Sequence, residues 1–239
     1  MQTVLVPGLL CSARLYGRVL PAVWRHGSVT IADTRRDDTI PAIAARLLAE
    51  APERFALVGL SMGGYVALEV MRQAPGRVAA LALISTSARP DTPEQRAARR
   101  EQLAAVRDGR FDELVERVFP VLVDEGARED EDLRAAWRAM AREVGPDAFA
   151  RQLEACIARA DARPLLDAIG CPAAVVHGTG DGLIPIENGE ELAAGIPGAR
   201  FTRVERCGHM SALERPAEVA AALERLLQGA WRPGEDTDT

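Results

Sequence analysis

The motif Gly-Leu-Ser-Met-Gly at residues 59–63 is the pattern most able to do chemistry in this chain. An apolar run at 55–60 leads into it, and an amphipathic segment at 62–73 follows. That order predicts a strand, a sharp turn and a helix, with Ser61 on the turn. The small residues on either side leave room for the neighbouring backbone. The first helical amides would face the serine hydroxyl, where negative charge develops when the oxygen attacks a carbonyl group.

A serine nucleophile needs a base to accept its proton, and the chain has three histidines. His26 precedes the second expected strand, at the wrong end of the sheet. His177 closes an expected strand, and a structural, hydrogen-bonded role is the favoured interpretation. His209 follows the last expected strand, so its loop opens at the same edge as Ser61. We therefore expect His209 to be the base.

The base in turn needs a carboxylate that fixes its tautomer and stabilises the imidazolium. Asp181 follows the strand before the one that leads to His209, which places the two side by side. Asp33 also ends a strand, but that strand is expected beyond the serine's strand, and turn capping is the favoured interpretation. Asp91 would serve if the acid came from the loop after the fourth strand. The predicted triad is Ser61, Asp181 and His209, in the chain order expected for this arrangement.

Two backbone amides must hold the oxyanion that forms during attack. One is expected from Met62, the residue after the nucleophile. The other is expected from Leu9 in the loop after the first strand, with Leu10 as the alternative one position later. The side chains expected to line an apolar substrate pocket are those of Leu10, Tyr65, Leu183 and Met210.

The composition is that of a soluble globular protein, with 48% hydrophobic and 27% charged residues. A net charge of −6 argues against nucleic acid or an anionic membrane as the main partner. No stretch resembles a signal peptide or approaches the roughly 20 apolar residues that span a bilayer. The four cysteines lack C-x-x-C spacing, which predicts reduced thiols and a cytoplasmic location. Cys11 and Cys207 lie near the proposed site, and apolar packing is the favoured interpretation of both.

Strands and helices are expected to alternate outside the middle of the chain. The expected strands are 3–6, 29–32, 55–60, 78–84, 173–177 and 200–204. The expected helices among them are 15–24, 40–51, 62–73, 186–195 and 216–228. This alternation predicts an α/β fold with a mostly parallel sheet flanked by helices. Right-handed crossovers would place the carboxyl ends of all strands at one edge, where such sheets bind ligands.

The pattern changes between residues 87 and 166, where no strand is expected. Four helices are expected in this stretch, at 93–107, 112–123, 131–144 and 147–160. An all-helical block inserted after the strand that follows the elbow helix would cover the active edge of the sheet. The predicted organisation is a core of residues 1–86 and 167–231, a helical cap of residues 87–166 and a disordered acidic tail at 232–239.

These motifs together resemble the α/β-hydrolase superfamily, and in particular its small bacterial esterase-like members with a helical cap. The resemblance depends on residues 7–10, 59–64, 178–181 and 208–209. It implies a Ser-Asp-His triad, a lid and neither a cofactor nor a metal. Two features depart from the family pattern. Pro7 replaces the usual histidine of the oxyanion loop, and the usual first two antiparallel strands are not expected.

The expected activity is hydrolysis of a carboxylic ester of a small or medium hydrophobic substrate through an acyl-enzyme. Thioester, lactone or carbon–carbon bond hydrolysis would use the same triad, and the sequence hardly separates these reactions. A ligand-binding member without chemistry is less favoured, because all three triad residues are present. The expected partner is a small molecule, and the sequence leaves its identity and the oligomeric state open.

Overall fold

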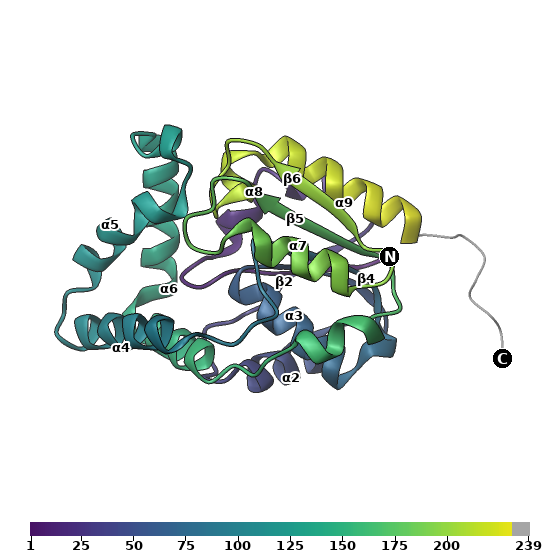
Figure 1. The fold of residues 1–239 in the computed structure, drawn as a ribbon, viewed down its shortest axis with the longest axis horizontal. Helices are drawn as coiled ribbons and strands as arrows, with labels where there is room; N and C mark the ends of the chain where they lie inside the picture. The colour runs from purple at the N-terminus through teal and green to yellow at the C-terminus, as the bar shows by residue number, and fades with distance from the viewer. Residues whose placement is uncertain (231–239) are drawn as a thin grey trace.

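A six-stranded sheet forms the centre of the computed structural model, which describes residues 1–230 (Figure 1). All five strand pairings are parallel, and the strand order is β2-β1-β3-β4-β5-β6. The strands are β1 (Thr3–Val6), β2 (Val29–Ile31), β3 (Phe55–Leu60), β4 (Val78–Ile84), β5 (Ala173–Gly178) and β6 (Arg200–Val204). The structure thus confirms the predicted α/β class and parallel sheet. The predicted tail at 232–239 lies outside the described residues.

Helices cover both faces of the sheet, which explains why the four inner strands β1, β3, β4 and β5 are nearly continuous apolar runs that are buried throughout. Leu5 packs into the cluster on one face, whereas Val4 and Val6 pack into the cluster on the other, as the two-residue period of a strand requires. The helices are α1 (Leu20–Trp24) and α9 (Pro216–Ala230) on one face, and α2 (Ile40–Glu50), α3 (Met62–Gln73) and α7 (Ile186–Gly195) on the other.

The strand order reverses between β1 and β3. From β1 the chain first adds β2 on one side, then crosses to β3 on the other side and continues outward. Such a reversal opens a crevice at the carboxyl ends of the two strands. Val6 is paired with Gly59, so the loops that follow β1 and β3 emerge next to each other.

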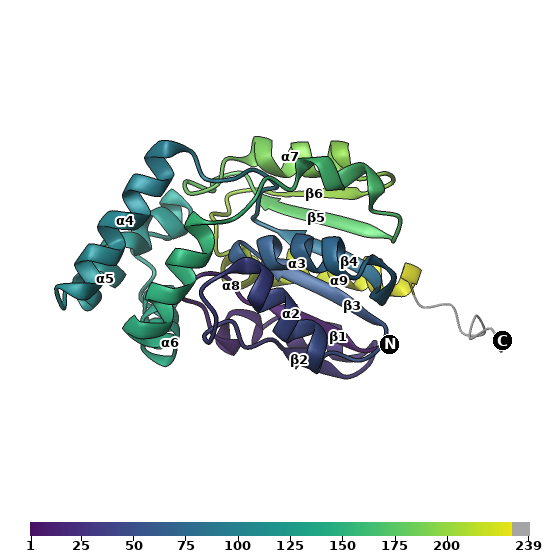
Figure 2. The same ribbon diagram turned by 90° about the horizontal axis from the view of Figure 1, so that it is seen from below.

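A helical block lies beyond the carboxyl ends of the strands (Figures 1 and 2). It consists of α4 (Pro93–Arg107), α5 (Phe111–Leu122) and α6 (Glu131–Ile157). The amino terminus, where β1 begins, lies at the opposite end of the sheet. Residues 87–166 contain helices and turns but no strand, as their pattern predicts. Across residues 1–230, none of the helices combines the length and apolar character that crossing a bilayer requires.

The predicted helix at 15–24 is confirmed only in its second half. A 3₁₀ turn occupies Ala13–Tyr16, and the short helix α1 starts only at Leu20. Pro21 lies in the first turn of α1, where its missing amide does no harm. A single helix through this stretch would instead have placed Pro21 in its interior and cost it a hydrogen bond.

The break predicted near residue 145 is a kink inside α6. Gly145 leaves helical geometry with φ 77° and ψ 165°, and Pro146 follows it. The two halves therefore point in different directions, and the second half reaches the core loops. The short helix α8 (Ser211–Glu214), just after His209, was not predicted.

Candidate active site

Ser61 occupies the turn between β3 and α3 in a strained conformation, with φ 55° and ψ −116°. Two hydrogen bonds hold it there. Its amide donates to the carbonyl oxygen of Ile84 at 2.9 Å, and the hydroxyl of Thr86 donates to the Ser61 carbonyl oxygen at 2.8 Å. Both partners belong to β4 or the loop after it, so the neighbouring strand fixes the serine.

The flanking glycines are required because backbone atoms occupy the space of a side chain. A Cβ atom on Gly59 would lie 2.2 Å from the carbonyl oxygen of Gly63. A Cβ atom on Gly63 would lie 2.0 Å from the carbonyl oxygen of Val6. The spacing of the motif therefore follows from the close approach of α3 to both β1 and β3.

His209 and Asp181 form a buried hydrogen-bonded pair. His209 Nδ1 lies 2.8 Å from Asp181 Oδ2. Because a carboxylate only accepts, Nδ1 carries the proton, and Nε2 is left as an acceptor. Asp181 Oδ1 accepts from the amides of Leu183 and Ile184, both at 2.9 Å, so the acid is held at both oxygens.

A second histidine also approaches this carboxylate. His177 Nε2 lies 3.4 Å from Asp181 Oδ2 and 2.8 Å from the carbonyl oxygen of Ile184, to which it donates. Burial alone would raise the pKa of Asp181, but the two histidines stabilise the carboxylate and the pKa lies below its usual value. His177 is fully buried, which fits the structural role that the sequence favoured.

The loop that carries His209 is tied to the helical block. Glu214 in α8 accepts hydrogen bonds from the amides of Gly208 and Asp124, and Asp124 follows α5. The amide of Met210 donates to the carbonyl oxygen of Leu122 at 3.0 Å. The histidine is thus positioned by the core and by the helical block together. The sequence analysis did not predict this hydrogen-bonding role of Glu214.

Gln152 in α6 of the helical block holds the loop after β1 by a hydrogen bond. Leu10 has a φ of 59°, and its amide donates to Gln152 Oε1 at 2.9 Å. Gln152 is fully buried, and its Nε2 donates to the hydroxyl of Thr34 at 3.0 Å. Within residues 1–230, no acceptor bonds the amides of Leu9 and Met62. Leu9 rather than Leu10 therefore has the free amide beside Ser61.

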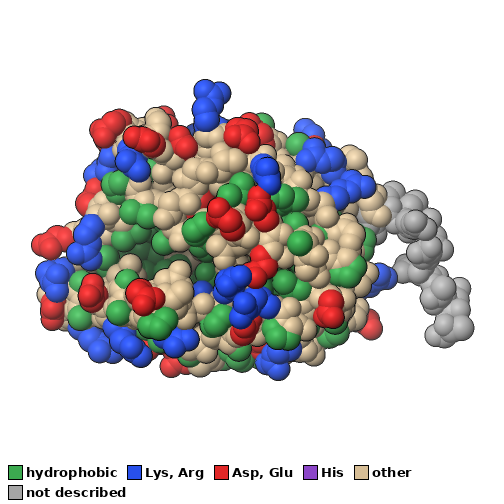
Figure 3. Space-filling model, viewed as in Figure 1, with side chains coloured by type: hydrophobic (Ala, Val, Ile, Leu, Met, Phe, Trp, Pro, Cys, Tyr) green, Lys and Arg blue, Asp and Glu red, His purple; other side chains and the backbone are tan. Residues whose placement is uncertain are grey.

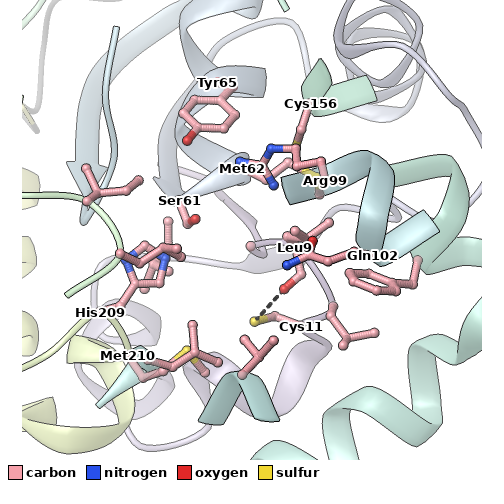
Figure 4. A pocket seen from close by; sticks show the side chains of 18 of the residues that line it. Leu9, Cys11, Ser61, Met62, Tyr65, Arg99, Gln102, Cys156, His209 and Met210 are labelled. Atoms are coloured by element: carbon pink, nitrogen blue, oxygen red, sulfur yellow. Dashed lines mark hydrogen bonds between the residues drawn. The ribbon is translucent and has the colours of Figure 1, made fainter. Parts of the chain in front are cut away.

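A cavity of about 150 Å³ lies between these loops and the helical block. Ser61 and His209 both line it, and they face the same space in Figure 4. Figure 3 shows a hollow with hydrophobic walls at this end of the molecule. All residues expected in the pocket line the cavity, namely Leu10, Tyr65, Leu183 and Met210, and the backbone candidates Leu9 and Met62 line it as well.

The remaining candidates lie elsewhere or do other things. Asp33 pairs with Arg35 and Arg36 near the end of β2, and neither it nor Asp91 contacts His209. His26 belongs to the opposite end of the sheet, where its carbonyl oxygen accepts from the chain's first amino group.

All four cysteines are free. Cys11 lines the cavity, but burial raises its pKa to about 12, so the thiol stays neutral. Burial likewise raises the pKa of Cys207. Among the residues that the structure describes, no three His, Cys, Asp or Glu side chains come together as a possible metal site.

Comparison with known proteins identifies the family of this chain. The family model described as the alpha/beta hydrolase family matches residues 3–222. A pimeloyl-(acyl-carrier protein) methyl ester esterase from Aromatoleum aromaticum is 32% identical over 221 residues, which are 87% of this chain and 86% of the relative. The chain therefore belongs to the α/β-hydrolase family.

Two solved structures show the same architecture over nearly the whole chain. A malate-bound esterase from Thermogutta terrifontis is 27% identical, with a TM-score of 0.86 over 96% of this chain and 90% of that one. An enol-lactonase from Burkholderia xenovorans is 25% identical, with a TM-score of 0.86 over 95% of this chain and 91% of that one. The likeness thus extends through the helical block as well as the sheet.

Proposed function

We propose that this α/β hydrolase cleaves carboxylic esters through an acyl-enzyme on Ser61. The observation that carries the proposal is the His209–Asp181 pair at 2.8 Å, which leaves Nε2 as an acceptor in the cavity that Ser61 lines. A strained serine next to an oriented histidine is the arrangement that nucleophilic acyl transfer requires. The esterase relatives favour an ester as the bond that is cleaved.

In the proposed mechanism, His209 Nε2 accepts the Ser61 proton while Oγ attacks the ester carbonyl carbon. The amides of Leu9 and Met62 donate to the oxyanion of the tetrahedral intermediate. His209 then protonates the leaving alkoxide, and the acyl group remains on Ser61. A water molecule, deprotonated by His209, attacks the acyl-enzyme and releases the acid. Asp181 keeps Nδ1 protonated and stabilises the imidazolium in both halves.

Residues 87–166 act in this proposal as a cap over a core of residues 1–86 and 167–231. The cap supplies much of the apolar cavity wall, from the side chains of Leu114, Val118, Leu122, Trp137 and Phe149. At about 150 Å³ the cavity is comparable to one that holds benzene, so it suits a small acyl or alcohol group. We also propose the cytoplasm as its compartment, because all four thiols are free.

Short p-nitrophenyl esters test this proposal directly. Ser61→Ala and His209→Ala should each lower kcat by at least about 10³-fold. The first variant lacks the nucleophile that forms the acyl-enzyme, and the second lacks the base that accepts its proton. Ser28→Ala is the matched control, since Ser28 is exposed and outside the cavity. Wild-type rates in the Ser61→Ala protein would contradict the mechanism.

Lactone hydrolysis is the second candidate, because an enol-lactonase is among the similar structures. It needs the same triad and oxyanion hole and differs only in substrate shape. Comparison of kcat/KM for small lactones and for their open-chain methyl esters separates the two. We expect the open-chain esters to be preferred, and a preference of more than about tenfold for a lactone would reverse the assignment.

A further inference from the structure

Two arginines lie in the wall of the cavity, which is otherwise mostly apolar, with the neutral polar side chains of Gln95 and Gln102 from α4 beside them. Arg99 from α4 and Arg159, just after α6, line it together with Ser61. No aspartate or glutamate of the described chain lines it. Asp91, in the segment between β4 and α4, lies behind the two arginines and is buried. It accepts from Arg99 Nε at 2.8 Å and, through its other oxygen, from Arg159 Nη1.

The two arginines are not equivalent. Arg159 has an almost completely buried side chain and also donates to the carbonyl oxygens of Arg89 and Cys156, each at 3.1 Å. Its guanidinium lies over the ring of Tyr65, 4.2 Å from the centroid. Arg159 is therefore a fixed part of the structure that joins the cap to the core.

Arg99 uses only one side of its guanidinium. Its Nε donates to Asp91, whereas its two terminal nitrogens bond no acceptor within residues 1–230. The side chain keeps 18% of its exposure, and in Figure 4 it reaches into the cavity near Tyr65 and Met62. Four N–H donors of a cavity-lining side chain are thus left without an acceptor in the described protein.

The charges at this wall do not balance. Two guanidinium groups share the one carboxylate of Asp91, so one positive charge is left over. An uncompensated charge beside an apolar cavity is costly, and an anion in the cavity would relieve that cost. A planar pair of N–H groups matches a carboxylate, which also carries the single charge that is needed. A phosphate dianion would need more positive charge than this wall offers.

The arginine cluster lies close to the nucleophile in the fold. Tyr65, over which Arg159 is stacked, lies one helical turn after Ser61, and its amide donates to the Ser61 carbonyl oxygen. Because the cavity holds only about 150 Å³, the anion and the reacting ester must belong to one small molecule. We propose that Arg99 binds a substrate carboxylate and that the enzyme prefers small esters carrying a free carboxylate. This inference rests on the proposed esterase function.

The test compares anionic esters with neutral esters of the same carbon chain, and each kcat/KM is counted per scissile ester bond with the cleaved bond identified from the products. The substrates are monomethyl esters of dicarboxylic acids with four to eight carbons and the corresponding dimethyl esters, together with ω-acetoxy acids and their methyl esters. The quantity measured is the ratio of kcat/KM for the anionic ester to that for its neutral partner. We expect a ratio above one for at least one chain length in the wild type.

Arg99→Gln should lower that ratio about 10- to 100-fold, mainly through KM, which is the range of one desolvated charge-assisted hydrogen bond. Arg99→Lys keeps the charge without the planar fork and should give an intermediate ratio. Arg100→Gln makes the same charge change at an exposed neighbouring position outside the cavity and should leave the ratio unchanged. The ratio stays informative even if Arg99→Gln lowers the stability of the protein. Both rates are measured on the same concentration of folded enzyme, which cancels in the ratio.

Three results would overturn the inference. The wild type could hydrolyse neutral esters with no preference for any anionic partner, which leaves the esterase proposal intact. Arg99→Gln could lower both rates equally, which would make Arg99 structural. The wild type could hydrolyse no ester of either kind, in which case the proposed function fails together with this inference. Inhibition of the wild type by free dicarboxylic acids offers a check without any variant, and its absence would count against the subsite.

Discussion

Gln152 offers the sharpest test of how the cap controls the oxyanion hole. Its Oε1 accepts from the Leu10 amide and its Nε2 donates to Thr34, so one buried side chain joins α6 to the loops after β1 and β2. Leu10 is in a left-handed conformation that few non-glycine residues adopt. We infer that this bond holds the loop in the position that presents the Leu9 amide.

Gln152→Leu keeps most of the side-chain volume but neither hydrogen bond. A buried donor left without a partner costs about 1 to 3 kcal/mol, and the lost bond to Thr34 adds about 1 kcal/mol. We therefore expect the free energy of unfolding to fall by about 2 to 4 kcal/mol. Removal of one oxyanion donor typically costs about 10²- to 10³-fold in kcat. Because the Leu9 amide would be displaced rather than removed, we expect kcat to fall about 10- to 100-fold.

Urea denaturation and steady-state hydrolysis of p-nitrophenyl butyrate measure the two effects separately. Thr34→Val is the matched control, because it removes only the hydroxyl acceptor of Gln152 Nε2 and leaves both the Thr34 carbonyl acceptor at 3.3 Å and the Leu10 bond in place. It should cost about 1 kcal/mol of stability and less than about threefold in kcat. If Gln152→Leu loses stability as expected but keeps the wild-type kcat, the Leu10 bond does not position the oxyanion loop.

Two further predictions follow from the elbow and the acid. Gly63→Ala should lower the free energy of unfolding by about 2 to 4 kcal/mol, because the added Cβ atom would clash with the Val6 carbonyl oxygen. Gly76→Ala is the control, because open space surrounds Gly76. Equal shifts of the unfolding midpoint in the two variants would refute the steric explanation. Folding lowers the pKa of Asp181 from its ordinary value of 3.8, so the carboxylate stabilises the fold at pH values above 3.8. This contribution to stability is lost as the pH falls below 3.8. The stability gap between wild type and Asp181→Asn should therefore be largest near pH 7 and shrink below about pH 4 in urea denaturation, and a constant gap would contradict it.

The core of the site could be predicted because it depends on strand order. The inner strands are apolar runs that the sequence shows clearly, and a parallel sheet brings the residues after its strands to one edge. The loops of Ser61, Asp181 and His209 could therefore be placed together without any side-chain geometry. The helix expected at 15–24, of which only the second half forms, shows the limit of apolar spacing, since Pro21 outweighed it.

The contributions of the cap could not be predicted in the same way. Arg99 lies on a helix rich in charged residues, and nothing local distinguishes a side chain facing a cavity from one facing solvent. Only the packing of α4 against α5 and α6 makes that distinction. Gln152 did leave a signal, because it shares the apolar face of α6 with Phe149, Leu153 and Cys156. A polar residue at a core position of a helix indicates a specific buried hydrogen bond.

The central claim, that Ser61 is a nucleophile activated by His209, is tested most directly by a fluorophosphonate reagent and mass spectrometry of the labelled peptides. The reagent phosphonylates an activated serine and leaves ordinary hydroxyls unmodified. We predict one modification per chain, on the peptide that contains Ser61, and its loss in both Ser61→Ala and His209→Ala. Labelling at another serine, or labelling of Ser61 that persists at the wild-type rate in His209→Ala, would contradict the account.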